Sequence, residues 1–391
     1  MIDQHDEPEA GLLTPAQQDH VADACFQCSL CVVECPYQPG LHEYEIDIAS
    51  LMLRSVAMQH ANGHRGARTQ LARKVLGRPG RVGRVASRFS GSANRFTGAE
   101  PGSLLRKLTS LMTGVSPTRR LAPFAQQCFS QWFAQRPRIT LQKRQAEVTL
   151  YPTCLVEYQA TDVGKDLVKV YERNGVECRN SQADCCGAPL LHAGDVAGFT
   201  KAARRNVAAL AGEIRRGGDV VVPQPTCAAM LTEHYVEHLR GTSSESDAML
   251  VAARTHDANA YLMQLHREDD YVLDTDFDGE THRRITYQVP SHIRAGAAGV
   301  PGRDLMKLTG ARVHLVQQSS GVEGIWGLRA GNEAAGGDAG ARLAELVERA
   351  GADAVAADCH FAHGVIAEHT GVATTHPLQI VARAYGIPEE R

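Results

Sequence analysis

The chain has 391 residues, 43% of them hydrophobic, and a formal net charge of −3 at pH 7. A chain of this length can bury a sizeable core, so we expect a soluble globular protein of two or three domains. No stretch approaches the ~18–20 apolar residues of a membrane span, and the acidic start MIDQHDEPEAG lacks the features of a signal peptide. These observations predict a cytoplasmic protein whose 11 cysteines serve metal binding or catalysis rather than a disulfide framework.

Residues 25–36 read CFQCSLCVVECP, which places Cys25, Cys28, Cys31 and Cys35 at the spacing C-x2-C-x2-C-x3-C-P. In bacterial ferredoxins the first three cysteines of such a run hold one [4Fe–4S] cluster and the fourth ligates a second cluster. A structural zinc site usually pairs two short-spaced ligand couples across a loop, so the tight spacing favours iron–sulfur. We predict a small α-helical, ferredoxin-like [4Fe–4S] domain over residues 1–60.

The chain has no second run of this kind, so the fourth ligand of the N-terminal cluster is open. A partner subunit, a second copy of the chain, or recruitment of Cys128 or His42 within the chain would each complete the site. We rank a partner or a second protomer first, because Cys35 would otherwise serve nothing. The expectation is a homodimer or heteromer joined at residues 20–45.

Residues 61–145 form a basic segment, in which Glu100 is the one acidic residue between Arg65 and Arg120. We predict a solvated linker with a few amphipathic helices. The alternative is docking to an acidic partner or to anionic lipid headgroups at the inner face of a membrane. No recognition motif accompanies the charge, which argues against nucleic acid.

From residue 146 onward, short apolar strands alternate with helices. The segment EVTLYPTC is a strand that ends at Cys154, VGKDLVKVYERNG is a helix stopped by Gly175, and DVVVPQPTC is a buried strand that leads to Cys227. This alternation indicates α/β layering.

An internal repeat divides this part of the chain into residues 146–275 and 276–391. The segments LYPTCLVEY, DCCGAPLL and VVVPQPTCAAM of the first half recur as YQVPSHIRA, QSSGVEGI and VAADCHFAHGV in the second. Three matched landmarks in the same order predict a duplicated α/β unit in which each copy once carried thiolates at loop ends.

A ferredoxin-like run followed by two copies of a C…CCG…C-x-x-C domain resembles a family of iron–sulfur proteins. The family includes the iron–sulfur subunits of anaerobic glycerol-3-phosphate dehydrogenase and of glycolate oxidase, and a related component of heterodisulfide reductase. The segments CPYQPGLHEYEIDIASLMLRSVA, CLVEYQATDVGKDLVKVYERNGVE and CCGAPLL carry the resemblance. The first is similar to the branch that accompanies rubrerythrins. The resemblance implies electron transfer from a flavin or thiol centre through iron–sulfur clusters to a quinone or another carrier, with a flavoprotein dehydrogenase or a rubrerythrin-like protein as redox partner.

The first repeat keeps four thiols of the family pattern, Cys154, Cys185, Cys186 and Cys227, while Gln224 occupies the first position of the usual C-x-x-C. We predict that these four thiols hold a second cluster, with a cubane [4Fe–4S] as the simplest choice and Gln224 or His192 near an iron left open. The alternative is a group of buried core thiols, because free cysteine is among the most buried residue types.

The second repeat has lost most of its thiols and is predicted to be a scaffold without a cluster. Hydroxyl groups are poor replacements for thiolate at soft iron–sulfur sites. We read Cys128 and Cys178 as core residues, and we rank a new metal site in the segment CHFAH low. The replaced positions are Ser291, Ser319, Ser320 and Ala362, which leaves Cys359 alone.

The sequence therefore predicts an electron-transfer iron–sulfur protein with two [4Fe–4S] clusters, and it assigns no catalytic residue. The first rival is a redox- or iron-responsive binding protein in which cluster occupancy controls docking. The second rival is an enzyme that reduces a disulfide or a peroxide directly at the cluster of the first repeat.

Overall fold

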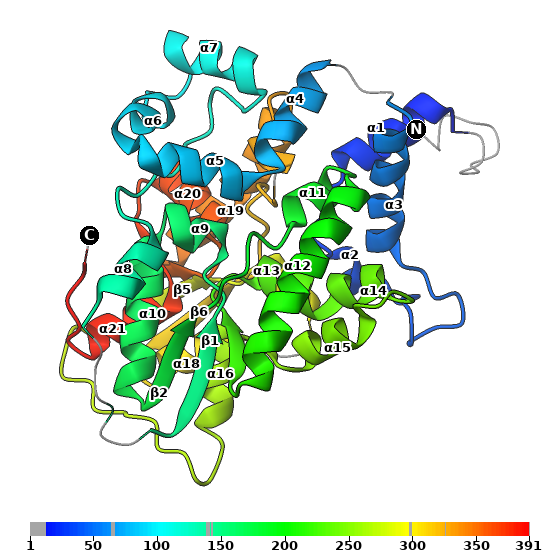
Figure 1. Cartoon of the computed structure of the whole chain (residues 1–391). Helices are drawn as coiled ribbons and strands as arrows, with labels where there is room; N and C mark the ends of the chain where they lie inside the picture. Colours follow the sequence, from blue (N-terminus) through cyan, green and yellow to red (C-terminus); the bar gives the residue numbers. More distant parts are fainter. Residues whose placement is uncertain are drawn as a thin grey trace.

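The computed structural model describes residues 13–63, 67–137, 141, 144–296, 299–324 and 326–390. The acidic start of the chain and Arg65, which entered the predictions above, lie outside these ranges. Two sheets form the centre of the molecule, and helices from the first third of the chain lie over one end and one side of it (Figure 1).

Both sheets have four parallel strands and the same topology. The first runs in the order β2-β1-β3-β4 and the second in the order β6-β5-β7-β8, so in each the first strand of the unit lies between the second and the third. This shared order confirms the predicted duplicated α/β fold. The strands are β1 (Ala146–Leu150), β2 (Val176–Asn180), β3 (Asp219–Val222), β4 (Thr255–Asp257), β5 (Arg284–Gln288), β6 (Arg312–Val316), β7 (Ala354–Ala357) and β8 (Thr374–Thr375).

The register brings the carboxyl ends of the strands to one edge of each sheet. Leu150 at the end of β1 pairs with Asn180 at the end of β2 and with Val221 of β3. In a doubly wound sheet of this order, loops diverge to opposite faces beside the first strand, and ligands bind at that edge. The cysteines of the first repeat follow these three strands.

Amphipathic helices cover the first sheet. In α12 the buried residues Val207, Leu210 and Ile214 recur every three or four positions, as expected for a helix with one apolar face. Its first turn is capped by Asp195, whose carboxylate accepts from Gly198 N. The helices of this unit are α9 (Thr153–Tyr158), α10 (Thr161–Arg173), α11 (Ala188–His192), α12 (Val196–Arg215), α13 (Pro225–Ala229), the π-helix η3 (Met230–His234), α14 (Tyr235–Leu239), α15 (Glu245–Ala253) and α16 (Ala258–Leu265).

The two repeats share one hydrophobic core. Leu167 and Tyr171 of the first repeat belong to the same buried cluster as Leu378 and Val381 of the second. A second repeat that supplies part of this core stabilises the first whether or not it binds a cofactor. Its helices are α17 (Ser291–Ala295), α18 (Pro301–Lys307), the 3-10 helix η4 (Trp326–Leu328), α19 (Glu333–Ala350), α20 (His360–Thr370) and α21 (Pro377–Ala384).

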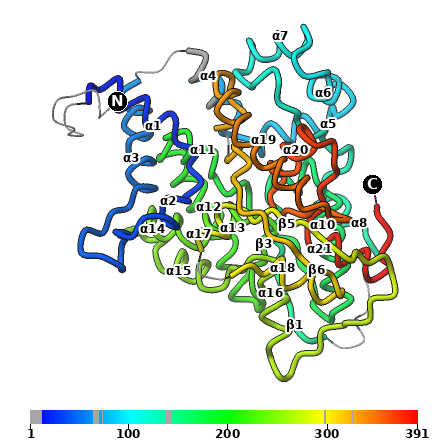
Figure 2. The backbone as a smooth tube through the Cα atoms, turned by 180° about the vertical axis from the view of Figure 1, so that it is seen from behind, coloured from blue at the N-terminus to red at the C-terminus, as the bar shows by residue number. Residues whose placement is uncertain are grey.

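The region before β1 is helical, as predicted for the N-terminal domain. The helix α3 packs on α1 and on α11, and α5 packs on α9. Figure 2 shows α1 and α3 on one side of the molecule and α5, α6 and α7 together on the other. These helices are α1 (Pro15–Ala24), α2 (Cys31–Glu34), α3 (Ile48–Ala61), α4 (Ala67–Leu76), α5 (Pro79–Arg88), α6 (Ser90–Thr97), α7 (Leu104–Thr113) and α8 (Phe129–Gln135).

Within the described ranges, no helix combines the length and the apolar character that crossing a bilayer requires.

The close packing of α10 predicts a strong effect of one added methyl group. A Cβ at Gly164 would lie 2.6 Å from Val156 Cγ1 and 2.7 Å from Phe129 Cδ2, both in the core, whereas a Cβ at Gly212 of α12 would meet nothing within 4 Å. We expect Gly164→Ala to lower the free energy of unfolding by about 1–3 kcal/mol. The control Gly212→Ala should raise it by about 0.5–1 kcal/mol, because alanine favours the helix. Urea denaturation of the full chain measures both, and equal effects of the two substitutions would contradict the packing.

Candidate functional site

Four thiols of the first repeat lie together at the carboxyl edge of its sheet. Cys154 follows β1, Cys185 and Cys186 follow β2, and Cys227 follows β3. The Cys154 and Cys185 thiols are hydrogen-bonded, as are those of Cys185 and Cys186. Cys186 Sγ lies 3.3 Å from Cys227 Sγ. The structure therefore brings together all four cysteines predicted to hold the second cluster.

The backbone around these thiols takes unusual conformations. Thr153, directly before Cys154, has a φ of +65°, which is strained for a β-branched residue. Gly187, directly after Cys186, has a φ of +84°, and a Cβ there would approach Phe199 Cδ2 to 2.9 Å. Strained residues of this kind cluster at functional sites, where the surrounding fold holds them in place.

A buried hydrogen-bond network holds the CCG loop in position. Asn206 Nδ2 donates to Cys185 O at 3.0 Å and to Tyr235 Oη at 2.9 Å. Tyr235 Oη in turn donates to Cys186 O at 2.8 Å. Outer-shell contacts of this type orient the ligands of a metal centre.

The four thiols form a soft donor set, in which Cys186 and Cys227 are buried. Hydrogen bonds from the Cys154 and Cys186 thiols lower the pKa of Cys185. The contacts with the neighbouring thiols, followed by burial, raise the pKa of Cys154 and Cys186. An all-sulfur set suits an iron–sulfur cluster, whose assembly displaces the remaining thiol protons. These residues therefore fit the cofactor that the sequence predicts.

The basic segment covers this site. A Cβ at Gly80, in the first turn of α5, would lie 3.6 Å from Cys185 Cβ. Arg84 Nη2 of the same helix lies 3.7 Å from Asp184 Oδ1, directly before the CCG sequence. The amino end of α5, which carries partial positive charge, thus lies against the thiols. The sequence shows that a helix begins at Pro79 but not what that helix covers.

Three cysteines of the N-terminal run lie near one another. Electrostatic interactions connect the Cys25 thiol with Cys28 and with Cys31, and burial raises the pKa of Cys28 to about 11. Cys35 ends α2, where its N–H donates to Cys31 O at 3.0 Å. Gln27 has a positive φ, so the backbone between the cysteines is also constrained.

The candidates for internal recruitment lie in other surroundings. Cys128 lies at the amino end of α8, where its N–H donates to Gln131 Oε1 at 3.2 Å. The His42 ring packs on Tyr37 and Tyr44, with centroid separations of 4.8 Å and 4.6 Å. Neither residue has an observed contact with Cys25, Cys28 or Cys31.

In the second repeat, a carboxyl group contacts two of the serines that stand at the predicted thiol positions. Ser291 Oγ and Ser319 Oγ both donate to Glu323 Oε1, at 2.9 Å and 2.7 Å. Glu323 is buried, which raises its pKa, and its charge acts on both Cys28 and Cys359. Sequence comparison of the two repeats missed Glu323 because it aligns with Pro189 of the first repeat and not with a cysteine.

The N-terminal cysteine run docks on loops of both repeats. The Phe26 and Trp326 rings lie 4.3 Å apart, and Trp326 Nε1 donates to Asp23 O at 2.6 Å. Gln27 Nε2 donates to the carbonyl of His192 at 3.4 Å. A Cβ at Gly324 of the second repeat would lie 2.6 Å from His192 Nδ1, so His192 lies where the cysteine run and both repeats meet.

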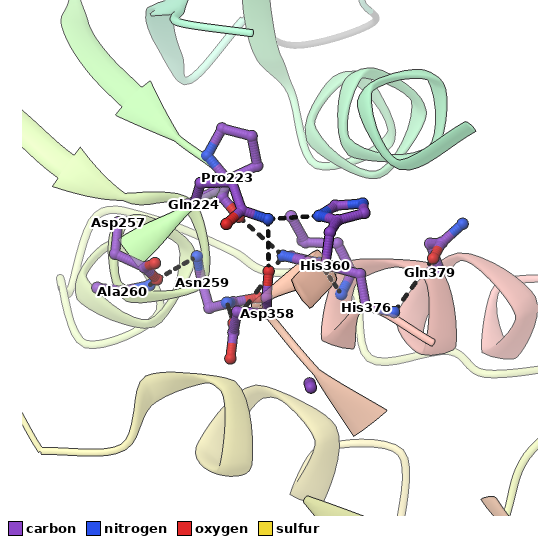
Figure 3. A network of polar contacts seen from close by, with 12 residues as sticks. Pro223, Gln224, Asp257, Asn259, Ala260, Asp358, His360, His376 and Gln379 are labelled. Carbon is purple, nitrogen blue, oxygen red and sulfur yellow. Dashed lines mark hydrogen bonds and ion pairs between the residues drawn. The ribbon is translucent and has the colours of Figure 1, made fainter. Parts of the chain in front are cut away.

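Gln224 faces the second repeat. Its Nε2 donates to Asp358 O at 2.8 Å and contacts His360 Nδ1 (Figure 3). The Asp358 carboxylate accepts from Asn259 Nδ2 at 2.5 Å and from Tyr287 Oη. Gln224 thus belongs to a buried polar network between the repeats. Its observed hydrogen bonds go to the second repeat, so they do not support the expectation that Gln224 lies near an iron atom.

Comparison with known proteins agrees with this geometry. Residues 148–232 match the family model CCG, described as a cysteine-rich domain. The chain is 25% identical over 332 residues to a subunit of the anaerobic glycerol-3-phosphate dehydrogenase of Escherichia coli K12, a match that covers 81% of this chain and 78% of that subunit. It is 32% identical over 168 residues to lactate utilization protein A of Geobacillus thermodenitrificans, which covers 42% of this chain and 66% of that protein.

The network between the repeats predicts a specific pH dependence. Burial lowers the pKa of His376 to about 3, so between that value and about 6.5 only the unfolded chain binds this proton, and stability falls as the pH falls. His376 caps α21 by accepting from Leu378 N, a role that asparagine can keep. We expect His376→Asn to flatten the loss of thermal stability between about pH 7 and pH 5.

Thermal unfolding midpoints across this range measure the effect, with His266→Asn, at an exposed position, as the control.

Asp358→Asn should have the opposite effect and make the loss of stability on acidification steeper. Burial, followed by the charge of Asp257, raises the pKa of Asp358 to about 7, so this carboxyl makes stability fall as the pH rises towards 7. Curves parallel to that of the parent protein would contradict both assignments.

Proposed function

The chain belongs to the proteins that carry the cysteine-rich CCG domain, and from this we propose that it is an iron–sulfur electron-transfer protein. It passes electrons between a flavin or thiol redox partner and a quinone or other acceptor. One observation carries the proposal: four thiols from three strand ends meet at one point, and the second cysteine run contacts the helix that follows the CCG sequence. The similarity to a component of a dehydrogenase supports an electron-transfer role.

In this proposal two [4Fe–4S] clusters supply one-electron storage. Cys154, Cys185, Cys186 and Cys227 hold the first. The protein's own contribution there is positional, because Asn206 and Tyr235 fix the loop, and α5 with the surrounding core excludes water from it.

The N-terminal cluster is held by Cys25, Cys28 and Cys31, with Cys35 directed to a shared site. The hydrogen bond from Gln27 to the carbonyl of His192 connects the N-terminal cysteine run to α11, which follows the CCG sequence. Electrons would cross at this junction, since α3 and α4 also pack on α11.

The redox partner, or a second copy of the chain, is proposed to dock at residues 20–45. Large apolar side chains are exposed on and just beyond this segment, and Leu41 is 73% exposed. An apolar surface beside a redox centre suits protein association. The exposed side chains are Val21, Val33, Tyr37, Leu41, Tyr44, Ile46, Ile48 and Leu51.

Iron analysis with electron paramagnetic resonance tests the assignment. Anaerobically purified protein should contain about eight iron atoms per chain and give two cluster signals that a flavoprotein reduces reversibly. Cys186→Ala should lose about half of the iron and one signal. Cys178→Ala removes a buried thiol of β2 outside the four, and Cys359→Ser removes the thiol left in the second repeat; both should keep the parent iron content.

Full iron in Cys186→Ala would refute the ligand assignment. If the protein loses its clusters instead of being reversibly reduced, and its affinity for a partner changes at the same time, the redox- or iron-responsive binding protein is favoured. Size measurement of the same samples tests the shared site, because a monomer that keeps its N-terminal cluster after Cys35→Ala would exclude ligation by a partner.

We further propose that α5, α6 and α7 lie on the inner face of a membrane. Leu104 and Met112 of α7 are each 74% exposed, and Leu108, Leu111 and Phe89 are exposed as well. These apolar side chains belong to a segment with a single acidic residue, and that combination is typical of helices that lie on anionic lipid.

Vesicle sedimentation tests this orientation. Replacing Leu104 and Met112 with Glu should weaken binding to anionic vesicles roughly tenfold or more, because the apolar contact is lost and negative charge is added. Met249→Glu is the matched control, since Met249 is exposed on α15, far from α7 in both views. Equal binding by parent and double variant, or equal binding to neutral and anionic vesicles, would contradict the proposal.

A further inference from the structure

A group of side chains that could bind a metal ion lies outside both cysteine sites. His234, Glu237 and His238 each offer one ligand atom, and these atoms all lie within 4.8 Å of one another. His234 Nδ1 is 3.7 Å from Glu237 Oε2, longer than an ordinary hydrogen bond. Two ligands about 2.1 Å from a shared tetrahedral ion would lie about 3.4 Å apart, so small adjustments bring this pair into range.

The local helix geometry presents the three residues on one face. Positions i, i+3 and i+4 of a helix are neighbours on its surface. A π-helical turn, η3, ends at His234, and Tyr235 N donates to Met230 O across it. Turns of this type are rare and occur frequently at functional sites. Here the turn also directs Tyr235, the residue between the group and the CCG loop, towards Cys186 O.

Both imidazoles are in a suitable state for coordination. His234 Nδ1 is buried and has no hydrogen-bond partner. His238 Nδ1 lies 3.0 Å from His234 O and can only donate to it, which leaves the lone pair on Nε2. A hydrogen bond from the other ring nitrogen to a backbone carbonyl is the usual second contact of a metal-bound histidine.

The Glu237 carboxylate lies beside the His234 ring and is open to solvent. The Glu237 side chain is 54% exposed, so an ion can reach the group from solvent. His192 and His292 act electrostatically on the same region, which places further imidazoles near His234.

We propose that His234, Glu237 and His238 bind a divalent transition-metal ion such as Zn²⁺ through two imidazole nitrogens and one carboxylate oxygen. This donor set suits zinc or ferrous iron better than magnesium or calcium. Three protein ligands leave positions open for water or for a fourth group. The bound ion links α14 to the CCG loop, because Tyr235 lies between two of its ligands and donates to Cys186 O.

Calorimetric titration of the cluster-loaded protein with Zn²⁺ tests the site. The parent protein should bind one ion that survives gel filtration, and zinc-edge X-ray absorption should show nitrogen and oxygen ligands without sulfur. His234→Ala/His238→Ala should weaken binding by at least about tenfold. Glu237→Gln, at a half-exposed position, should weaken it less without disturbing the fold. His266→Ala, an exposed histidine at the end of α16, is the control and should bind like the parent.

Sulfur ligands in the absorption spectrum would overturn the proposal, because they would place the ion at the cysteines. Unchanged affinity in the double histidine variant would also overturn it. If that variant fails to fold, Glu237→Gln decides the question, since parent-like affinity there removes the carboxylate from the site. The readout does not depend on electron transfer, so failure of the metal site leaves the proposed function untouched.

Discussion

The parallel alignment of β1, β2 and β3 is the constraint on which the molecule depends. Because these strands run in the same direction, their carboxyl ends meet at one edge, and the residues that follow them must share a small volume. Cys154, Cys186 and Cys227 are distant in sequence and meet for this reason alone. The strain at Thr153 and the contacts of Tyr235 then determine how the thiols are directed.

The duplication gives this arrangement a second use. Each repeat buries an apolar face against the other, so the second repeat remains necessary for stability after its thiols are gone. The polar network around Gln224, Asp358 and His376 occupies the interface at the ends of β3, β7 and β8 (Figure 3). Both repeats thus provide the core that supports the thiols of the first.

Sequence analysis predicted the α/β duplication and the meeting of the four thiols, because strand periodicity and cysteines at strand ends are local patterns. It could not predict contacts between distant segments. The approach of Gly80 to Cys185 joins two such segments, and Glu323 aligns with a proline. In the sequence, His234 and Glu237 look like part of an ordinary polar helix face. Only the structure shows the partial burial of His234 and the π-helical turn.

The carboxyl group in the second repeat makes cysteine unfavourable at the serine positions beside it. Glu323 is buried and depends on hydroxyl donors from Ser291 and Ser319. Changing either serine back to cysteine removes a donor from a buried carboxyl, which costs about 1–3 kcal/mol, before any cluster can form. Glu323 and its two serines therefore form a unit whose members constrain one another, and a single substitution does not give this repeat the thiol set of the first.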